Sequence, residues 1–246
     1  MVWWISNRIL VTRGGSHAYG LSRPDSDEDI RAIALPPVSW LLGMDLVGQR
    51  AQTVEEHAGQ DVVVHTVAKF CRLALHANPN TWDILFCPDD QILMQTVMGA
   101  ELRAMGEKFL SKRAYQSYSG YAASQLKKMR THNTAHGSRQ AEVRTFGYDT
   151  KNAMHLIRLL LTARALLQEG YVNIRRPERE FLLSIRDGHY TNIEIQDMAA
   201  QLDSECRQIV HRSGLPDVPE TAAVKDWLIE WQRQWVNGDL RVLTPV

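Results

Sequence analysis

The stretch that most constrains the fold is a glycine-rich turn followed, after a short spacer, by a pair of aspartates. The turn, Gly14-Gly15-Ser16, comes directly after an apolar run at residues 9–11. The aspartates, Asp27 and Asp29, stand just before a second apolar run at residues 30–35. Glycines let the backbone turn tightly and let a ligand approach its N–H groups. This order predicts two strands, with a turn after the first and acidic groups before the second.

The chemistry of this stretch favours phosphoryl or nucleotidyl transfer. Residues two apart in a strand face the same side, so Asp27 and Asp29 would lie together and Glu28 would point away. Mg²⁺ is usually held by one or two carboxylates plus substrate phosphates. A helix that begins near Ser16 would offer its free N–H groups to a phosphate. Each half alone is more typical of an ordinary loop and a solvated acidic turn. The combination at short separation predicts transfer chemistry.

These residues carry a family resemblance. Gly15-Ser16, a ten-residue spacer, Asp27-x-Asp29 and an apolar Ile30 resemble the signature of the DNA polymerase beta-like nucleotidyltransferase superfamily. Residues 15–21 and 25–31 look closer to one branch, the predicted bacterial and phage nucleotidyltransferases linked with RNA repair. Further similarity lies in four segments, at residues 69–74, 78–80, 117–122 and 152–160. The resemblance therefore runs from about residue 9 to about residue 188.

The resemblance implies a site with two Mg²⁺ ions, with Mn²⁺ as an alternative. Asp27 and Asp29 would bind both ions. A third acid on another strand completes the site in the superfamily, and Asp61 stands where the resemblance would place it, although it could simply end a loop. Asp61 would also help to deprotonate the attacking hydroxyl. Gly15 and Ser16 would hold the β- and γ-phosphates of an NTP such as ATP.

The hydrophobic patterns predict an α+β chain of two domains. A nucleotidyltransferase α/β domain with a short mixed sheet would cover residues 1–110, and an all-helical domain residues 111–246. We expect strands at residues 5–12, 30–35 and 61–65, helices at 66–76 and 91–105, a strand or turn at 82–86, and a loop or weak hairpin at 43–60. We expect the later helices at residues 112–130, 150–168, 177–186, 193–210 and 221–236. Tryptophans follow one stripe of the last helix, which is typical of a core or a partner seam.

The charge of the chain limits how it could bind RNA. The 246 residues carry a formal net charge of zero, so an RNA-binding surface would have to be a local basic patch. One candidate is the group of Lys127, Lys128 and Arg130, followed by a basic loop that includes His132, His136, Arg139 and Arg144. The spacing of His132 and His136 could suggest a metal site, but their polar context favours a loop over a zinc site. Another candidate is the helical face formed by Lys151, His155 and Arg158, which would neutralise triphosphate charge or would simply be solvated.

The cysteines and the hydropathy pattern indicate the cellular compartment that we expect for the protein. The 3 cysteines lie far apart, which argues against a disulfide framework or a zinc cluster and fits a reducing cytoplasm. The N-terminus lacks the features of a signal peptide, and no apolar run is long enough to predict a membrane span.

Three functions compete at this point. The first is nucleotide addition to, or repair of, an RNA 3′ end, with tRNA as the natural candidate. The second is nucleotide transfer to a protein or small molecule, as in related toxin–antitoxin and antibiotic-modifying enzymes. The third is a non-catalytic nucleotide- or RNA-binding module. The three acids weigh against the third, and nothing local in the sequence separates the first two. The oligomeric state stays open.

Overall fold

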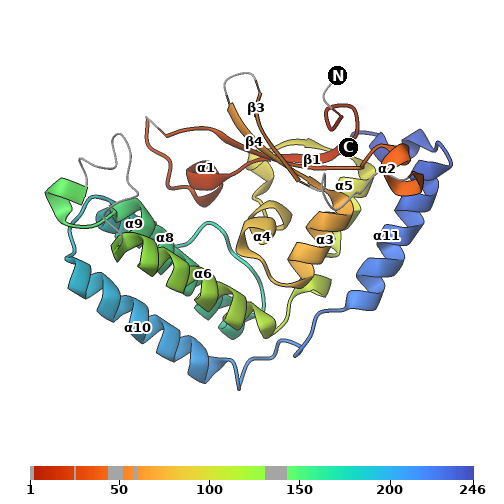
Figure 1. The fold of residues 1–246 in the computed structure, drawn as a ribbon. Coiled ribbons are helices and arrows are strands. Elements are labelled where there is room, and N and C mark those ends of the chain that lie inside the picture. Colours follow the sequence, from red (N-terminus) through yellow and green to blue (C-terminus); the bar gives the residue numbers. More distant parts are fainter. Residues whose placement is uncertain (1–2, 25, 44–51, 58–59, 131–142) are drawn as a thin grey trace. The chain divides into compact units, whose positions relative to one another are not determined.

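The chain forms two compact units in the computed structural model, which describes residues 3–24, 26–43, 52–57, 60–130 and 143–246. The first unit comprises Met1–Leu110 together with Val218–Val246, and the second comprises Ser111–Asp217. The division after residue 110 lies where the sequence pattern changes. The C-terminal segment differs from the expected organisation, because it packs with the first unit and not with the helical one. Figure 1 shows the elements of each unit.

The first unit is built on a five-stranded mixed sheet with the strand order β3-β4-β2-β1-β5. The strands are β1 (Arg8–Arg13), β2 (Asp29–Ala34), β3 (Gln52–His57), β4 (Gln60–Thr66) and β5 (Ile92–Gln95). The β2–β4 pair is parallel, and the β1–β2, β1–β5 and β3–β4 pairs are antiparallel. The predicted fold class, with a short mixed sheet near the N-terminus and helices after it, is confirmed.

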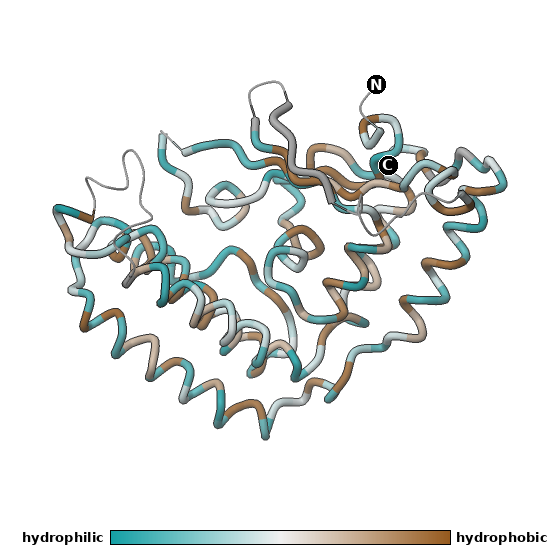
Figure 2. The backbone as a smooth tube through the Cα atoms, viewed as in Figure 1, coloured by the Kyte–Doolittle hydropathy of each residue, from teal (hydrophilic) through white to brown (hydrophobic). Residues whose placement is uncertain are grey.

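The two faces of this sheet differ in character. One face buries an apolar cluster made of Trp4, Val11, Ile30, Ala32, Ala34, Val62 and Val64. Side chains alternate along a strand, so Asp29 and Arg31 of β2 share the opposite face with Asp61 and His65 of β4. Phe70 packs on that face with its ring centroid 6.5 Å from His65. Figure 2 shows the apolar residues following the central strands.

Short helices cover the sheet of the first unit. They are α1 (Gly15–Tyr19), α2 (Val38–Leu42), α3 (Val67–Leu75), α4 (Pro79–Leu85), α5 (Val97–Ala104) and α11 (Thr221–Val236), with 3₁₀ turns η1 (Asp89–Gln91), η2 (Gly106–Phe109) and η4 (Leu240–Leu243). Figure 1 shows α3 and α4 on the same side of the sheet.

Two segments differ from their predicted structure. Residues 82–86, expected as a strand or turn, belong largely to α4. The side chain of Asn78 caps this helix by accepting from the N–H groups of Asn80 and Thr81, and Pro79 stands at its start. Residues 91–105, expected as one helix, begin with β5, and α5 starts only after Thr96. The Thr96 hydroxyl accepts the N–H of Gly99 and so caps the new helix.

The tryptophan stripe of α11 is anchored inside the first unit. Trp231 donates its indole N–H to Glu101 at 2.8 Å, and Trp235 donates to the carbonyl of Pro36 at 2.9 Å. A β-bridge between Thr96 and Pro245 extends the attachment. The stripe therefore belongs to the interior of this unit rather than to a helical domain.

The second unit is helical. Its main helices are α6 (Arg113–Arg130), α8 (Thr150–Glu169), α9 (Arg179–Arg186) and α10 (Asn192–Ile209). Helix α8 starts at an Asp149 cap, ends at Gly170 with φ of 80°, and is buried on nearly every side, which is typical of the central helix of a bundle. No helix in the described ranges is both long and apolar enough to cross a membrane.

Candidate active site

The predicted turn lies between β1 and α1 and touches the second aspartate directly. The Gly14 N–H donates to the Asp29 carbonyl at 2.7 Å. Gly15 has φ of 57°, a left-handed conformation that favours glycine. A Cβ atom at Gly15 would lie 2.2 Å from Oδ2 of Asp29, so no larger residue fits there. The turn and the aspartate, thirteen to fifteen residues apart in the sequence, therefore form one site.

The structure pairs Asp29 with the third predicted acid. Asp29 of β2 and Asp61 of β4 are direct register partners across the parallel ladder. Neighbouring strands lie about 4.8 Å apart and paired residues share a face, so both side chains leave the same face of the sheet. Asp61 is exposed, whereas the Asp29 side chain is 33% exposed. The two positions present carboxylates beside each other at one end of the sheet.

Asp27 stands two residues before Asp29, outside the strand, and its side chain is exposed. Among the residues that the structure describes, no three side chains of His, Cys, Asp or Glu are grouped closely enough to hold a metal ion. Convergence of Asp27 with the other two acids therefore stays a prediction. The oxygen donors of Asp29 and Asp61, next to a turn that admits no side chain, fit a hard divalent cation.

Arginines balance the negative charge at the turn. Arg31 pairs with Asp29 through Nη2 and Oδ1 at 3.3 Å, and its Cγ would lie 2.9 Å from a Cβ at Gly14. Arg13 pairs with Glu28 at 2.5 Å, which holds that carboxylate apart from Asp29. Arg31 has no role in the site predicted from the sequence. Its position two residues after Asp29, on the same strand face, was the signal that could have identified it.

His65 extends the site along β4, on the same face as Asp61. Its side chain is 6% exposed, and its pKa falls to about 4, first because of burial and then because Lys69 and Arg31 are nearby cations. His65 is therefore neutral near pH 7. The sequence pattern alone places His65 on the same strand face as Asp61. It does not show that Lys69 and Arg31 lie near His65.

The residues that follow the turn are held by α4. Ser16 is the second residue of α1, and Tyr19 at the end of this helix donates its hydroxyl to Asp83 Oδ2 at 2.6 Å. Between them, the Nε2 atom of His17 is buried without a hydrogen-bond partner among the described residues. The Tyr19–Asp83 bond fixes the turn relative to the helices that cover the sheet.

The second unit gathers the predicted basic residues of two helices. Arg158 is 1% exposed, and its Nη2 lies 3.3 Å from Nδ1 of His155. The pKa of His155 is lowered to about 3, first by burial and then by Arg158, Lys128 and Lys151. Lys128 on α6 is thus close enough to act on α8. Lys128, which was predicted to bind RNA, therefore lies near His155 and Arg158, which were predicted to bind the NTP.

The other predicted basic residues are less informative. Lys127 and Lys151 are exposed, while the side chain of Arg130 lies outside what the structure describes. His132, His136 and Arg139 also lie outside the described residues. We refer below to Lys128, Lys151, His155 and Arg158 as the basic cluster.

No curated protein matches the chain. Among solved structures, the chain resembles a nucleotidyltransferase-like protein from Exiguobacterium sibiricum 255-15, with 11% sequence identity and a TM-score of 0.29 over 94% of this chain and 75% of that one.

A family model describes the chain over nearly its whole length. Residues 7–230 match the model described as "RlaP: RNA repair pathway DNA polymerase beta family". The match includes the glycine turn, all three predicted acids and the basic cluster. The chain belongs to this RNA repair pathway DNA polymerase beta family and is a nucleotidyltransferase.

Proposed function

We propose that the protein transfers a nucleoside monophosphate from an NTP to the 3′ end of an RNA, with tRNA as the first candidate. The observation that carries the proposal is the pairing of Asp29 with Asp61 beside Gly15. Carboxylates next to a tight glycine turn fit a metal-bound triphosphate. The family description supplies the connection to RNA repair.

Asp27, Asp29 and Asp61 would hold the metal. Bound Mg²⁺, or Mn²⁺, would neutralise phosphate charge and favour in-line displacement. Among these acids, Asp61 is exposed and free to receive the proton of the attacking hydroxyl. Arg31 holds Asp29 in place through its ion pair.

The proposed transfer forms one bond, breaks one bond and moves one proton. The RNA 3′-oxygen forms a bond to the α-phosphorus while the bond from that phosphorus to the pyrophosphate oxygen breaks. The hydroxyl proton passes to Asp61 and then to water. The Ser16 hydroxyl and the N–H groups of the turn at Gly15 would donate hydrogen bonds to the β- and γ-phosphates.

The basic cluster would bind phosphate groups of the substrates. Arg158 and His155 lie against each other inside the second unit, and Lys128 and Lys151 raise the positive potential around them. The positive charge that these side chains share favours a phosphate ligand over a solvated helix face. Lys151, His155 and Arg158 would contact phosphates of the nucleotide, and Lys128 would contact the RNA backbone.

A labelling experiment tests the proposal. The protein is incubated with each α-labelled NTP, Mg²⁺ or Mn²⁺, and either tRNA or no RNA, and the label is followed on RNA and on protein. We expect label on RNA, and we expect Asp29→Asn and Asp61→Asn to abolish it. Asp89→Asn is the matched control, because Asp89 is a 90%-exposed aspartate of the same unit on η1 and is not a predicted metal ligand. Label on protein with RNA unchanged would replace the RNA acceptor with a protein one.

A further inference from the structure

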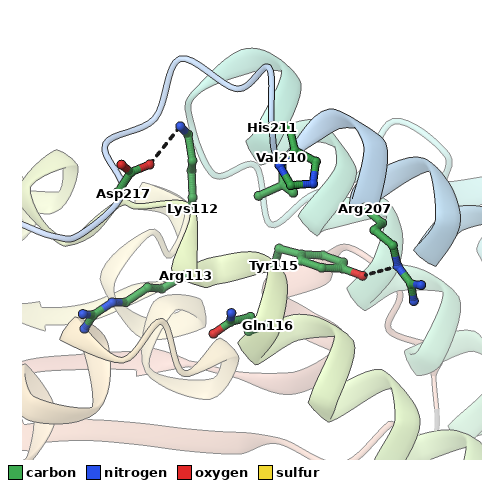
Figure 3. A pocket seen from close by; sticks show the side chains of 8 residues that line it. All are labelled: Lys112, Arg113, Tyr115, Gln116, Arg207, Val210, His211 and Asp217. Atoms are coloured by element: carbon green, nitrogen blue, oxygen red, sulfur yellow. Dashed lines mark hydrogen bonds and ion pairs between the residues drawn. The ribbon is translucent and has the colours of Figure 1, made fainter.

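A cavity lies in the helical unit, away from the basic cluster. It has a volume of about 400 Å³ and is formed by the start of α6, the end of α10 and the segment that follows it. Its lining is made of Lys112, Arg113, Tyr115, Gln116, Arg207, Val210, His211 and Asp217 (Figure 3). Ligand pockets commonly measure about 300–1,000 Å³, so the cavity can take one nucleotide-sized group.

This cavity is distinct from the site that the proposed function uses. Arg113 begins α6 and Lys128 lies 15 residues later on the same helix. At about 1.5 Å per residue, the two positions are roughly 22 Å apart along the helix axis. A ligand in the cavity would therefore contact a different part of the second unit from one at the basic cluster.

The cationic side chains of the cavity are only partly neutralised. Lys112 pairs with Asp217 at 2.9 Å, and Arg207 pairs with Asp203 at 3.2 Å. Within the described part of the chain, no hydrogen bond or ion pair involves the side chains of Arg113 or His211. Asp217 is 83% exposed, so solvent weakens its compensation. The lining thus keeps a positive charge that an anionic ligand can use.

An aromatic ring completes the lining. The Tyr115 hydroxyl accepts a hydrogen bond from Arg207 Nε at 3.3 Å, which holds the phenol across the gap between α6 and α10. Figure 3 shows this ring between the two helices, with Val210 and His211 on the α10 side. Single-stranded nucleic acid is bound by this pairing of an aromatic platform with basic side chains.

We propose that this cavity binds one nucleotide of a single-stranded RNA, with Tyr115 stacking on the base and Arg113 contacting a phosphate of the strand. The inference rests on the proposed RNA acceptor and adds a second contact to it. The cavity holds the strand, while the chemistry takes place elsewhere. The ligand unit is a nucleoside monophosphate within an RNA strand.

Fluorescence anisotropy of the full chain with a labelled single-stranded RNA about eight nucleotides long tests this. The titrations contain EDTA and no NTP, so they do not depend on catalysis. Tyr115→Ala should weaken binding about 5- to 150-fold, because stacking on one base contributes that much, and Tyr115→Phe should keep most of the affinity. Arg113→Ala should lower the salt slope by about 0.7.

Arg212→Ala is the matched control, because Arg212 is an exposed arginine next to His211 that does not line the cavity. It should leave the affinity within about twofold of wild type. Equal losses for Arg113→Ala and Arg212→Ala would show a diffuse charge effect and overturn the cavity assignment. Unchanged binding for Tyr115→Ala would overturn it as well.

Three further outcomes separate this inference from the proposed function. Free AMP bound in a Tyr115-dependent way, with RNA binding unaffected, would assign the cavity to a free nucleotide and overturn the RNA assignment. Transfer of label to RNA together with normal RNA binding by Tyr115→Ala would overturn the cavity while leaving the proposed function intact. Label on protein alone would overturn the proposed function, whereas Tyr115-dependent RNA binding would still support the cavity.

Discussion

At the scale of single residues, Gly15 is the most constrained position of the candidate site. Its φ is positive, a conformation that is strained for residues with a side chain. In addition, Asp29 Oδ2 occupies the space where a Cβ atom would lie. The two effects can be separated. A side chain at positive φ costs about 1–2 kcal/mol wherever it occurs, whereas displacement of Asp29 affects the reaction only here.

Gly15→Ala should therefore destabilise the protein by about 1–2 kcal/mol and also abolish nucleotide transfer. Gly170→Ala is the control, because Gly170 has φ of 80° but nothing within 4 Å of its added Cβ. It should show a similar loss in urea unfolding and retain transfer. Full activity of Gly15→Ala would contradict the placement of Asp29 at the turn.

His65 gives a pH prediction. Its pKa is near 6.5 in an unfolded chain and about 4 in the folded protein, so the unfolded state binds more protons between these values. The folding stability should be complete above pH 6.5 and should fall as the pH is lowered toward 4, by on the order of 3 kcal/mol. His155 adds a loss in the same direction, continuing to about pH 3.

Unfolding followed at pH 7 and pH 5 measures this effect. His65→Gln should flatten the pH dependence, because glutamine does not titrate. His76→Gln, which replaces an exposed histidine of the same unit, should leave it unchanged. Equal slopes for all three proteins would contradict a buried neutral His65.

At the scale of elements, strong local signals were predictable from the sequence and tertiary pairings were not. The strands around the turn and the long helices α6, α8 and α10 follow from hydrophobic period and caps. Strand β5 was missed because its four residues run directly into the capped helix α5, so the pattern looked like one helix. The Lys128–His155 proximity depends on which elements pair, information that a single sequence lacks.

Helix α11 gives a prediction at this scale. Trp231 is 8% exposed and bonds to Glu101, so Trp231→Ala should cost about 3–5 kcal/mol of the first unit's stability. Ile229→Ala, on the same helix but 63% exposed, should cost less than about 0.5 kcal/mol. Hydrogen exchange locates the effect. Loss of protection in α8 rather than in the sheet would return α11 to the helical unit.

At the scale of the whole molecule, zero net charge makes the placement of cations decisive. A neutral protein has no overall attraction for RNA, so binding must depend on local groups. The first unit offers the arginines near the turn, and the second unit offers the basic cluster and the cavity lined by Arg113. RNA binding should therefore respond to few side chains and not to total charge.

Lys127→Ala with Lys128→Ala tests this at the end of α6, where both side chains are exposed. If each contacts one phosphate, the slope of log affinity against log salt should fall by about 1.4 for single-stranded RNA. NTP affinity should decrease less, because Lys151 and Arg158 remain. Lys225→Ala with Arg233→Ala on exposed positions of α11 removes the same charge from the first unit and should leave the slope unchanged. An equal fall in both double variants would mean that RNA responds to net charge, and the local assignment would be wrong.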